Sequence, residues 1–234
     1  MDLAVILPTY NESRNIRDLI LAIERLNVAS LILVIDDSSP DGTQDVVRGL
    51  QKGFGNVMLV VRPCKMGLGT AIRDGFKILA LLVDRPAYVV TMDADFSHNP
   101  ADIPRLLQYA VKGFDVVVGS RYVEGGRIVG WSPLRVIVSG VANSLARVLI
   151  RLPVKDFTSG FRCYSMRYVL WALPRLRSRG FEIQVETLRL AQLFGARVAE
   201  MPITFVNRQM GKSKLNMGEI VGFLHYVMKA SFIR

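Results

Sequence analysis

Five short, continuously apolar segments interrupt the first 120 residues, and they restrict the possible folds more than any other feature of the chain. They cover residues 3–7, 31–35, 56–61, 87–92 and 115–120. Uninterrupted apolar runs of this length are typical of strands that are buried on both faces, as in parallel sheets. Amphipathic helical patterns separate the segments. The sequence therefore predicts an α/β fold with an open, mixed but mostly parallel sheet and helices on both faces.

Polar side chains follow four of these five predicted strands. Ligands of open α/β sheets bind outside the carboxyl ends of the strands, where the loops of parallel strands meet. We therefore expect one edge of the sheet to collect residues 8–12, Asp36 with Asp37, residues 93–95 and residues 119–121.

The segment Asp93-Ala94-Asp95 brings two carboxylates to one strand end. Such neighbours raise each other's pKa unless a cation or hydrogen-bond donors compensate them. Carboxylates suit a hard cation such as Mg²⁺ or Mn²⁺, which often binds one or two of them together with substrate phosphates. Aspartate is also frequent in turns, so the bare pattern is a weak signal. Its position directly after an apolar strand favours a metal site.

Asp36 and Asp37 end the second predicted strand, where an acidic side chain often holds the ribose or base of a nucleotide. Capping of the next helix is the alternative interpretation. The dinucleotide motif G-x-G-x-x-G does not follow the first strand, which argues against an NAD site.

The positive charge is concentrated in the second half of the chain. Residues 1–120 hold 12 Lys and Arg against 14 Asp and Glu, whereas residues 121–234 hold 18 against 6. This excess predicts an anionic partner: a phosphate ligand, a nucleic acid or acidic lipid headgroups. Basic side chains that follow a strand, occupy a Gly-containing loop or share a helix face with a hydroxyl are the candidates. They are Arg121, Arg208, Lys212, Lys214, and Arg135 together with Ser139.

Other polar residues carry weaker signals. His98 is interpreted as a support of the aspartate turn. Glu182 and Glu186 lie one turn apart on a predicted helix, and either include a catalytic base or form a surface pair. No leader, membrane-spanning segment or domain boundary is visible, so residues 1–234 are expected to form one domain that ends in an amphipathic helix.

Seven motifs occur in the order and spacing of family 2 glycosyltransferases. They are LPTYNE, VIDDSSPDGT, KMGLGTAIRDGF, MDADFSHNP, VVGSRY, DFTSGFRCY and GKSKL. More narrowly, residues 3–225 resemble the catalytic subunits of dolichol-phosphate mannose synthases, also through GW-x-x-x-R and F-V-x-R-x-x-G-x-S-K-L. Some members carry C-terminal membrane spans, and this chain resembles those without them.

The resemblance implies the GT-A fold of nucleotide-diphospho-sugar transferases, a Rossmann-like α/β architecture. Residues 1–120 would form the nucleotide-binding half and residues 121–234 the basic, acceptor-binding half. The implied donor-binding residues are Pro8, Tyr10, Glu12, Ile35, Asp37, Asp93, Ala94, Asp95, Arg121, Arg208 and Lys214. The implied metal ligands are Asp95, Asp93 and Ser97, the last directly or through a water, and the implied acceptor-phosphate ligands are Arg121, Arg135 and Ser139. Asp95 and Arg121 would be the catalytic residues.

The resemblance also implies a reaction. Mannose would pass with inversion from GDP-mannose to dolichyl or another polyprenyl phosphate, in the presence of Mg²⁺ or Mn²⁺. The product, dolichyl β-D-mannosyl phosphate, is a lipid-linked mannose donor for protein glycosylation. A phosphate acceptor is already anionic, so it needs positioning and desolvation more than a general base.

A lipid acceptor implies a membrane surface. The apolar and basic segment 133–152 is expected to lie at the interface with anionic lipid, as a peripheral element. The implied location is the cytoplasmic face of the endoplasmic reticulum membrane in a eukaryote or of the plasma membrane in a prokaryote. A small membrane-spanning partner subunit is a further expectation.

Three alternative functions remain open from the sequence. The nearest is glucose transfer from UDP-glucose to the same lipid. A sugar nucleotidyltransferase would carry a Gly-rich loop after its first strand, where this chain has PTYNE. A non-catalytic basic module that binds membranes or nucleic acid conflicts with the acidic strand ends, which would repel nucleic acid, so no nucleic-acid partner is expected.

Overall fold

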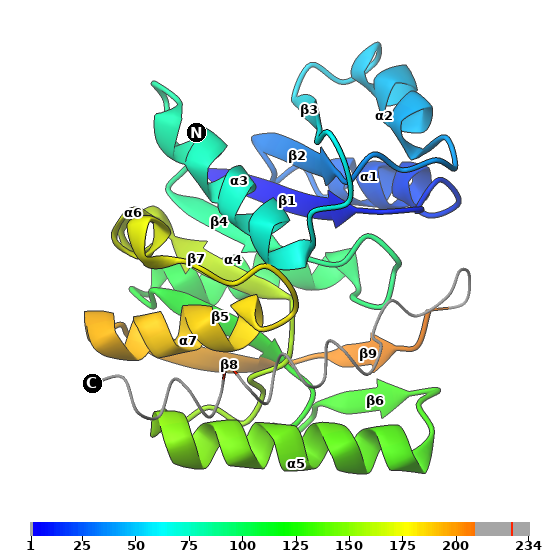
Figure 1. Ribbon diagram of the computed structural model, residues 1–234. Coiled ribbons are helices and arrows are strands. Elements are labelled where there is room, and N and C mark those ends of the chain that lie inside the picture. Colours follow the sequence, from blue (N-terminus) through cyan, green and yellow to red (C-terminus); the bar gives the residue numbers. More distant parts are fainter. Residues whose placement is uncertain (1, 209–225, 227–234) are drawn as a thin grey trace.

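The computed structural model describes residues 2–208 and Tyr226, and a seven-stranded sheet forms its centre (Figure 1). The strand order is β3-β2-β1-β4-β7-β5-β8. The first four strands in this order pair in parallel: β3 (Val57–Val61), β2 (Leu31–Asp36), β1 (Leu3–Thr9) and β4 (Tyr88–Thr91). The predicted sheet, mixed but mostly parallel, is confirmed.

The antiparallel element is β7 (Arg162–Ser165), which pairs with β4 on one side and with β5 (Val116–Ser120) on the other. β5 pairs in parallel with β8 (Val198–Pro202). Because β7 is antiparallel to both β4 and β5, these two strands run in the same direction. β5 and β8 therefore run in the direction of β1 and β4. The carboxyl ends of six strands therefore meet at one edge of the sheet, together with the segment that precedes β7.

Helices cover both faces of the sheet (Figure 1). One face carries α1 (Ile16–Glu24), α2 (Thr43–Gln51) and α4 (Ile103–Val111), which follows the short helix η1 (Pro100–Asp102). The other face carries α3 (Leu68–Leu81), α5 (Pro133–Ile150), α6 (Met166–Ala172), which continues into η2 (Leu173–Arg175), and α7 (Ile183–Phe194).

The strands are continuously apolar because helices cover both faces of the sheet. Successive side chains of a strand point to opposite faces. In β1, Leu3, Val5 and Leu7 therefore enter the core beneath α1 and α4, whereas Ala4 and Ile6 enter the core beneath α3 and α7. All five residues are fully buried.

A small second sheet lies beside the main one. In it, β6 (Arg127–Val129) pairs in parallel with β9 (Thr204–Val206). Ile203 separates β9 from β8, so the two strands follow one another closely in the chain but belong to different sheets. The backbone N–H of Val206 also donates to the carbonyl of Ser97 at 3.1 Å, which attaches β9 to the loop after β4.

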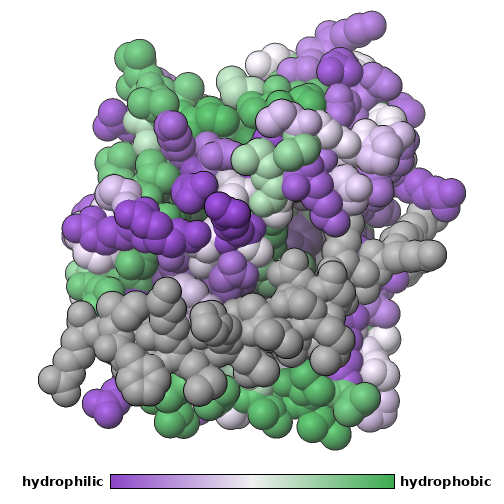
Figure 2. All heavy atoms as spheres, in the orientation of Figure 1, coloured by the Kyte–Doolittle hydropathy of each residue, from purple (hydrophilic) through white to green (hydrophobic). Residues whose placement is uncertain are grey.

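One side of α5 faces outward. The helix packs on the domain through Asn143, Ala146 and Ile150. Leu134, Ile137, Val141 and Val148 are between 62 % and 71 % exposed, and apolar residues dominate this lower edge in Figure 2. Among the described residues, α5 is the one helix long and apolar enough to cross a membrane, judged by length and composition alone. The amphipathic helix predicted at the end of the chain lies outside the described residues.

Candidate active site

A cavity of about 530 Å³ opens at the carboxyl edge of the sheet. The loops after β1, β2, β4 and β5 form one side of it, and α5 with the start of α3 forms the other. Most of the residues expected to bind substrate line this cavity. They are Pro8, Tyr10, Glu12, Asp37, Asp93, Ala94, Asp95, Arg121, Arg135, Ser139 and Arg208.

Two expected residues do not line the cavity, and a third lies outside the described residues. Ile35 is fully buried within β2 and does not line the cavity. Ser97 is 2 % exposed and lies behind the cavity wall. Lys214, like its neighbour Lys212, lies outside the described residues.

The loops at this edge contain unusual backbone conformations. Asn11 after β1, Ser38 after β2 and Phe96 after β4 have φ values of 57°, 53° and 59°. Residues other than glycine rarely adopt this left-handed region, and those that do often lie at functional sites. Here the three tight turns direct the polar residues beside them toward the cavity.

Asp95 is the best-compensated carboxylate of the turn after β4. It accepts hydrogen bonds from the backbone N–H and the hydroxyl of Ser97, at 3.0 and 2.5 Å, and pairs with the Arg208 guanidinium at 2.8 Å. Burial alone would raise the pKa of Asp95, but the Ser97 hydrogen bonds and the Arg208 charge lower it below its usual value. Asp95 is therefore ionised, and Ser97 orients it.

Asp93 has less compensation. Burial, and then the negative charge of Asp95, raise the pKa of Asp93 to about 7, although Arg208 and Arg121 oppose this. Two acids on one turn, one of them held against its ionised form, fit a site for a hard divalent cation. Among the described residues no group of three His, Cys, Asp or Glu side chains converges on a metal position. A cation here would take its remaining ligands from elsewhere, such as a diphosphate.

His98 supports the same turn. Its ring stacks on Phe161 and meets Phe205 edge-on, with centroid distances of 5.2 and 5.3 Å. Burial lowers the pKa of His98 to about 4, so the imidazole is neutral near pH 7. Its Nδ1 accepts the backbone N–H of Asp93 at 3.3 Å. These contacts agree with the predicted supporting role.

Asp36 and Asp37, at the end of β2, make different contacts. Asp36 accepts hydrogen bonds from Thr9, Ser39 and Gln44 and is fully buried, so it stabilises the loops. Asp37 faces the cavity, pairs with Arg62 and accepts the N–H groups of Met66 and Gly67 at 3.2 and 3.0 Å.

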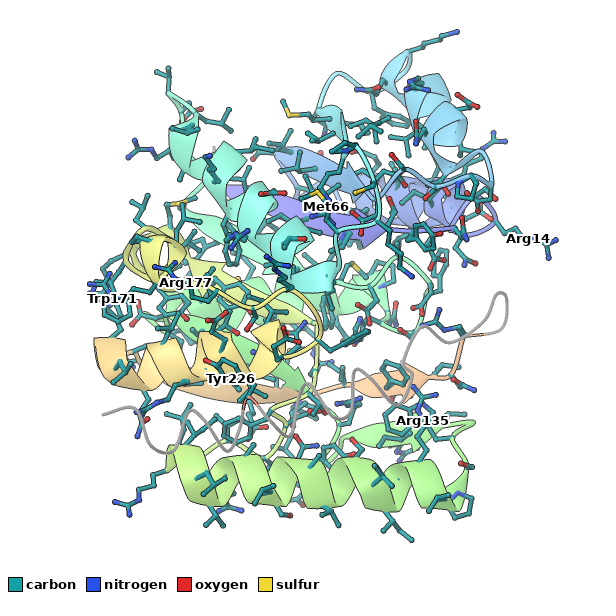
Figure 3. All side chains as sticks on the ribbon, viewed as in Figure 1. Arg14, Met66, Arg135, Trp171, Arg177 and Tyr226 are labelled. Carbon is teal, nitrogen blue, oxygen red and sulfur yellow. The ribbon has the colours of Figure 1, made fainter. Side chains whose placement is uncertain are left out.

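Three arginines, Arg121, Arg135 and Arg208, bring positive charge to the cavity. Arg121 lines the cavity, but two of its nitrogens donate to Asp156, at 2.8 and 2.7 Å. Arg135 extends from α5 toward β6 and β9 (Figure 3), and its guanidinium lies 4.0 Å from the centre of the Trp131 ring. Burial and then the charges of Arg208 and Arg121 lower the pKa of Arg135. Positive charges that act on one another in this way favour the binding of an anion in the cavity.

Glu182 and Glu186 fit neither prediction, a catalytic base or a surface pair, because both side chains accept hydrogen bonds from the backbone of a loop. The two oxygens of Glu186 accept the N–H groups of Arg177 and Ser178, each at 2.9 Å. Glu182 accepts those of Arg179 and Gly180, at 2.8 and 2.9 Å. Neither residue lines the cavity.

The loop that these glutamates hold closes the cavity from the α3 side. Its Arg179 carbonyl accepts the N–H groups of Gly69 and Thr70 at the start of α3, at 2.8 and 3.4 Å. A Cβ on Gly69 would lie 2.6 Å from the Ser178 carbonyl oxygen, so glycine permits this close approach. Phe181, at the end of the loop, lines the cavity.

Sequence reasoning missed several cavity residues. They are Lys65, Trp131, Thr158, Gly160, Phe181 and Phe205. Lys65 could have been identified from the sequence, because it begins the noted motif KMGLGTAIRDGF. In the structure its ammonium lies 4.4 Å from the centre of the Tyr10 ring. Thr158 and Gly160 belong to the noted motif DFTSGFRCY, but the strand that follows them was not predicted, so periodicity did not place them at the edge of the sheet.

The sequence is similar to a known family and to curated proteins. The family model described as glycosyl transferase family 2 matches residues 4–171. The chain is 41 % identical over 230 residues to an undecaprenyl-phosphate mannosyltransferase of Micrococcus luteus, covering 95 % of this chain and 90 % of that protein. It is 36 % identical over 227 residues to a polyprenol monophosphomannose synthase of Mycolicibacterium smegmatis, covering 92 % and 82 %.

Solved structures share the fold. The crystal structure of glucosyl-3-phosphoglycerate synthase from Mycobacterium tuberculosis, in complex with Mn²⁺, UDP and phosphoglyceric acid, superposes with a TM-score of 0.74 at 19 % identity. The match covers all of this chain and 79 % of that one.

Proposed function

The chain belongs to glycosyl transferase family 2, and on this premise we propose that it transfers mannose from GDP-mannose to dolichyl phosphate or another polyprenyl phosphate. The sugar and the acceptor are supported by the relatives, which are named for mannosyl transfer to undecaprenyl phosphate and for polyprenol monophosphomannose synthesis. GDP as the carrier nucleotide rests on the motifs alone.

One observation carries the proposal: a single helix contributes to the cavity and to an exposed apolar surface. Arg135 and Ser139 of α5 line the same cavity as Asp93 and Asp95. The outward side of the same helix is apolar and exposed. An acceptor with an anionic head and a hydrocarbon tail requires both features, and a soluble acceptor would require the first alone.

The acidic side of the cavity fits the donor. Asp37 follows β2 and lines the cavity, and an acidic residue at this place often holds the nucleoside, so Asp37 would bind it here. Asp93 and Asp95 would hold a divalent cation, Mg²⁺ or Mn²⁺, which supplies positive charge to the departing diphosphate. Arg208, whose guanidinium pairs with Asp95, is close enough to contribute to the same stabilisation.

The basic side fits the acceptor. A phosphate monoester is ionised at neutral pH, so its oxygen attacks the anomeric carbon without a base, and Arg135 with Ser139 orients it. Attack from the side opposite the leaving group inverts the anomeric centre and gives the β-linked product. Asp156 fixes the position of Arg121 in the cavity wall, so Arg121 contributes its charge from a rigid site.

We further propose that α5 lies in the membrane interface. Its exposed apolar side chains would enter the acyl boundary, and Arg135 would face the lipid phosphate. The enzyme would then act as a peripheral protein at the cytoplasmic face of a membrane, with or without a small spanning partner subunit.

The proposal is tested by supplying labelled GDP-mannose or UDP-glucose with a short polyprenyl phosphate, with and without Mg²⁺ or Mn²⁺. Metal-dependent mannosyl lipid formed from GDP-mannose is the expected result. If glucosyl lipid forms from UDP-glucose instead, the transferred sugar is glucose and not mannose. Lack of transfer from both donors by a folded, membrane-reconstituted protein would contradict the proposal.

A further inference from the structure

Arg135 is a cavity arginine that no carboxylate neutralises within the part of the chain that the structure describes. Arg121, by comparison, pairs with Asp156. The Nη1 of Arg135 donates to Asn207 Oδ1 at the long distance of 3.4 Å, and its Nε is buried without a hydrogen-bond partner among the described residues. Burial and then the charges of Arg208 and Arg121 lower the pKa of Arg135. A half-buried cation in this position needs another source of stabilisation.

The Trp131 ring supplies this stabilisation. The Cζ of Arg135 lies 4.0 Å from the centre of the ring, and the Cζ of Arg121 lies 5.2 Å from it. Both distances fall within the roughly 6 Å over which an aromatic face attracts a cation. Phe205 meets the Trp131 ring edge-on, with the two centroids 5.3 Å apart, and supports it from β9. One indole ring is therefore shared by two of the three cavity arginines.

The backbone on both sides of Trp131 is held in place. Gly130, between β6 and Trp131, has a φ of 81°, and a Cβ on it would lie 3.1 Å from the Cβ of Asn207. The Gly130 carbonyl accepts the Asn207 amide at 3.1 Å. On the other side, Ser132 caps α5 and accepts the N–H of Arg135 at 3.4 Å. The ring and the arginine therefore belong to one fixed corner between β6, β9 and α5.

An aromatic partner differs from a carboxylate in what it leaves to a ligand. Asp156 occupies Nε and Nη2 of Arg121 and neutralises its charge. A ring face attracts a guanidinium through its quadrupole, and it neither carries a negative charge nor occupies the N–H groups at the guanidinium edge. Trp131 therefore stabilises the Arg135 cation and leaves both its charge and its terminal donors for an anion, such as a phosphate.

We propose that Trp131 is a positioning residue for the acceptor: its ring holds the Arg135 guanidinium, charged and oriented, where the acceptor phosphate binds. This inference rests on the proposed function. It adds to that function a neutral residue that prepares the phosphate site before the acceptor arrives and acts through Arg135, without touching the lipid.

The experiment compares Trp131→Leu, which removes the aromatic face, with Trp131→Phe, which keeps a smaller one. Initial rates are measured with short polyprenyl phosphate and GDP-mannose varied in turn, and GDP binding is measured by calorimetry with Mg²⁺ present. Trp131→Leu is also combined with Arg135→Ala. Trp171→Leu is the matched control, because the Cζ of Arg175 likewise lies 4.0 Å from the Trp171 ring centre, but Trp171 does not line the cavity. Figure 3 shows Trp171 and Arg135 at different sides of the molecule.

We expect Trp131→Leu to raise the KM for polyprenyl phosphate roughly 3- to 30-fold. The kcat at saturating acceptor, the KM for GDP-mannose and the affinity for GDP should stay near their wild-type values. Trp131→Phe should recover most of the acceptor affinity, because its ring still attracts the cation. In the Arg135→Ala background, Trp131→Leu should cause no additional rise, since the group that it positions is gone. Trp171→Leu should leave the KM for the acceptor unchanged.

Three results would overturn the positioning role while the wild type transfers mannose normally. An additional rise in the Arg135→Ala background would show that Trp131 contacts the acceptor itself. Equal rises in both KM values, or a loss of GDP affinity, would show that Trp131 supports the cavity as a whole. A Trp131→Phe variant as impaired as Trp131→Leu would show that the aromatic face is not what Arg135 requires. A wild-type protein that transfers no mannose would contradict the proposed function first, and this inference with it.

Discussion

The charged residues of the cavity differ in how firmly neighbouring side chains hold them. Arg121 is fixed by Asp156, a fully buried carboxylate, through the two nitrogens of its guanidinium fork. Arg208 pairs with Asp95. Arg135 rests on the Trp131 ring and meets Asn207 only at 3.4 Å. We infer that Arg121 shapes the potential of the cavity, whereas Arg135 and Arg208 are the cations that a phosphate can engage directly.

Asp95→Asn should abolish most of the activity without unfolding the protein. The amide keeps the shape of the side chain but removes the charge that faces Arg208 and the expected cation. We expect kcat/KM to fall roughly 100-fold or more, and Mn²⁺ affinity, measured by calorimetry, to fall in parallel. Asp45→Asn is the control, because Asp45 is exposed and, within the part of the chain that the structure describes, pairs only with Arg48 in the next turn. Wild-type turnover by the Asp95 variant would remove this residue from the mechanism.

Arg135→Ala should affect the acceptor more than the donor. The variant loses a charged hydrogen-bond donor at the α5 side of the cavity, so the KM for polyprenyl phosphate should rise about 10-fold or more, with little change in the KM for GDP-mannose. Initial rates with each substrate varied in turn measure the two constants. Arg147→Ala, on the exposed side of the same helix, should change neither. Equal rises in both constants would contradict separate phosphate sites.

At the scale of elements, the hydrophobic pattern of the sequence predicted the strands and helices that have a clear local pattern of their own. The five apolar strands were predicted to within two residues of their observed ends, and α1, α3, α5 and α7 occur where helical patterns indicated them. β7, with the sequence RCYS, and β6, with the sequence RIV, lack the continuous apolar run by which the other strands were predicted. An error at β7 had consequences for the site, because an antiparallel strand brings its beginning, and not its end, to the ligand-binding edge. Gly160, Thr158 and Asp156 were missed for this reason.

The outward side of α5 should be required for membrane binding and not for chemistry. Ile137 is 62 % exposed and does not line the cavity. Ile137→Glu should weaken binding to anionic phospholipid vesicles about 10-fold or more, because a buried Ile contributes about 1.5–3 kcal/mol in an apolar environment. Sedimentation with vesicles measures this. Turnover of a short acceptor in detergent should stay at the wild-type level.

Leu81→Glu is the matched control for that experiment, since Leu81 is 74 % exposed at the far end of α3. If both variants bind vesicles as the wild type does, α5 is not the membrane contact. If the Ile137 variant also loses turnover in detergent, Ile137 contributes to the fold or to catalysis and not to membrane binding alone.

At the scale of the whole molecule, two buried carboxylates hold the β5–β7 half together from opposite ends. Asp156 binds Arg121 after β5. Asp115, before β5, accepts hydrogen bonds from Ser165, from Arg167 and from the backbone of Arg197. Burial works against ionisation of both, but their arginine partners and hydrogen bonds lower the pKa of each below its usual value.

These lowered pKa values predict the direction of the acid response. A carboxyl group with a lower pKa in the folded state contributes stability that is complete above its unfolded pKa, about 3.9, and is lost as pH falls below it. The free energy of unfolding, from urea titrations, should therefore decline below about pH 4. Asp115→Asn should cost about 1–3 kcal/mol at pH 7 and make that decline shallower. An unchanged slope would show that Asp115 does not contribute.

The insertion of β7 between β4 and β5 also has a consequence for biosynthesis. Both sheet neighbours of β5, which are β7 and β8, come later in the chain. A growing polypeptide emerges from the ribosome in order, so β1 to β4 can assemble while β5 still has no partner. The edge of β4 must then remain open until residues 162–165 have been translated, and the cavity is incomplete until Arg208 follows. A nascent chain should therefore lack the complete cavity until residue 208 has been translated.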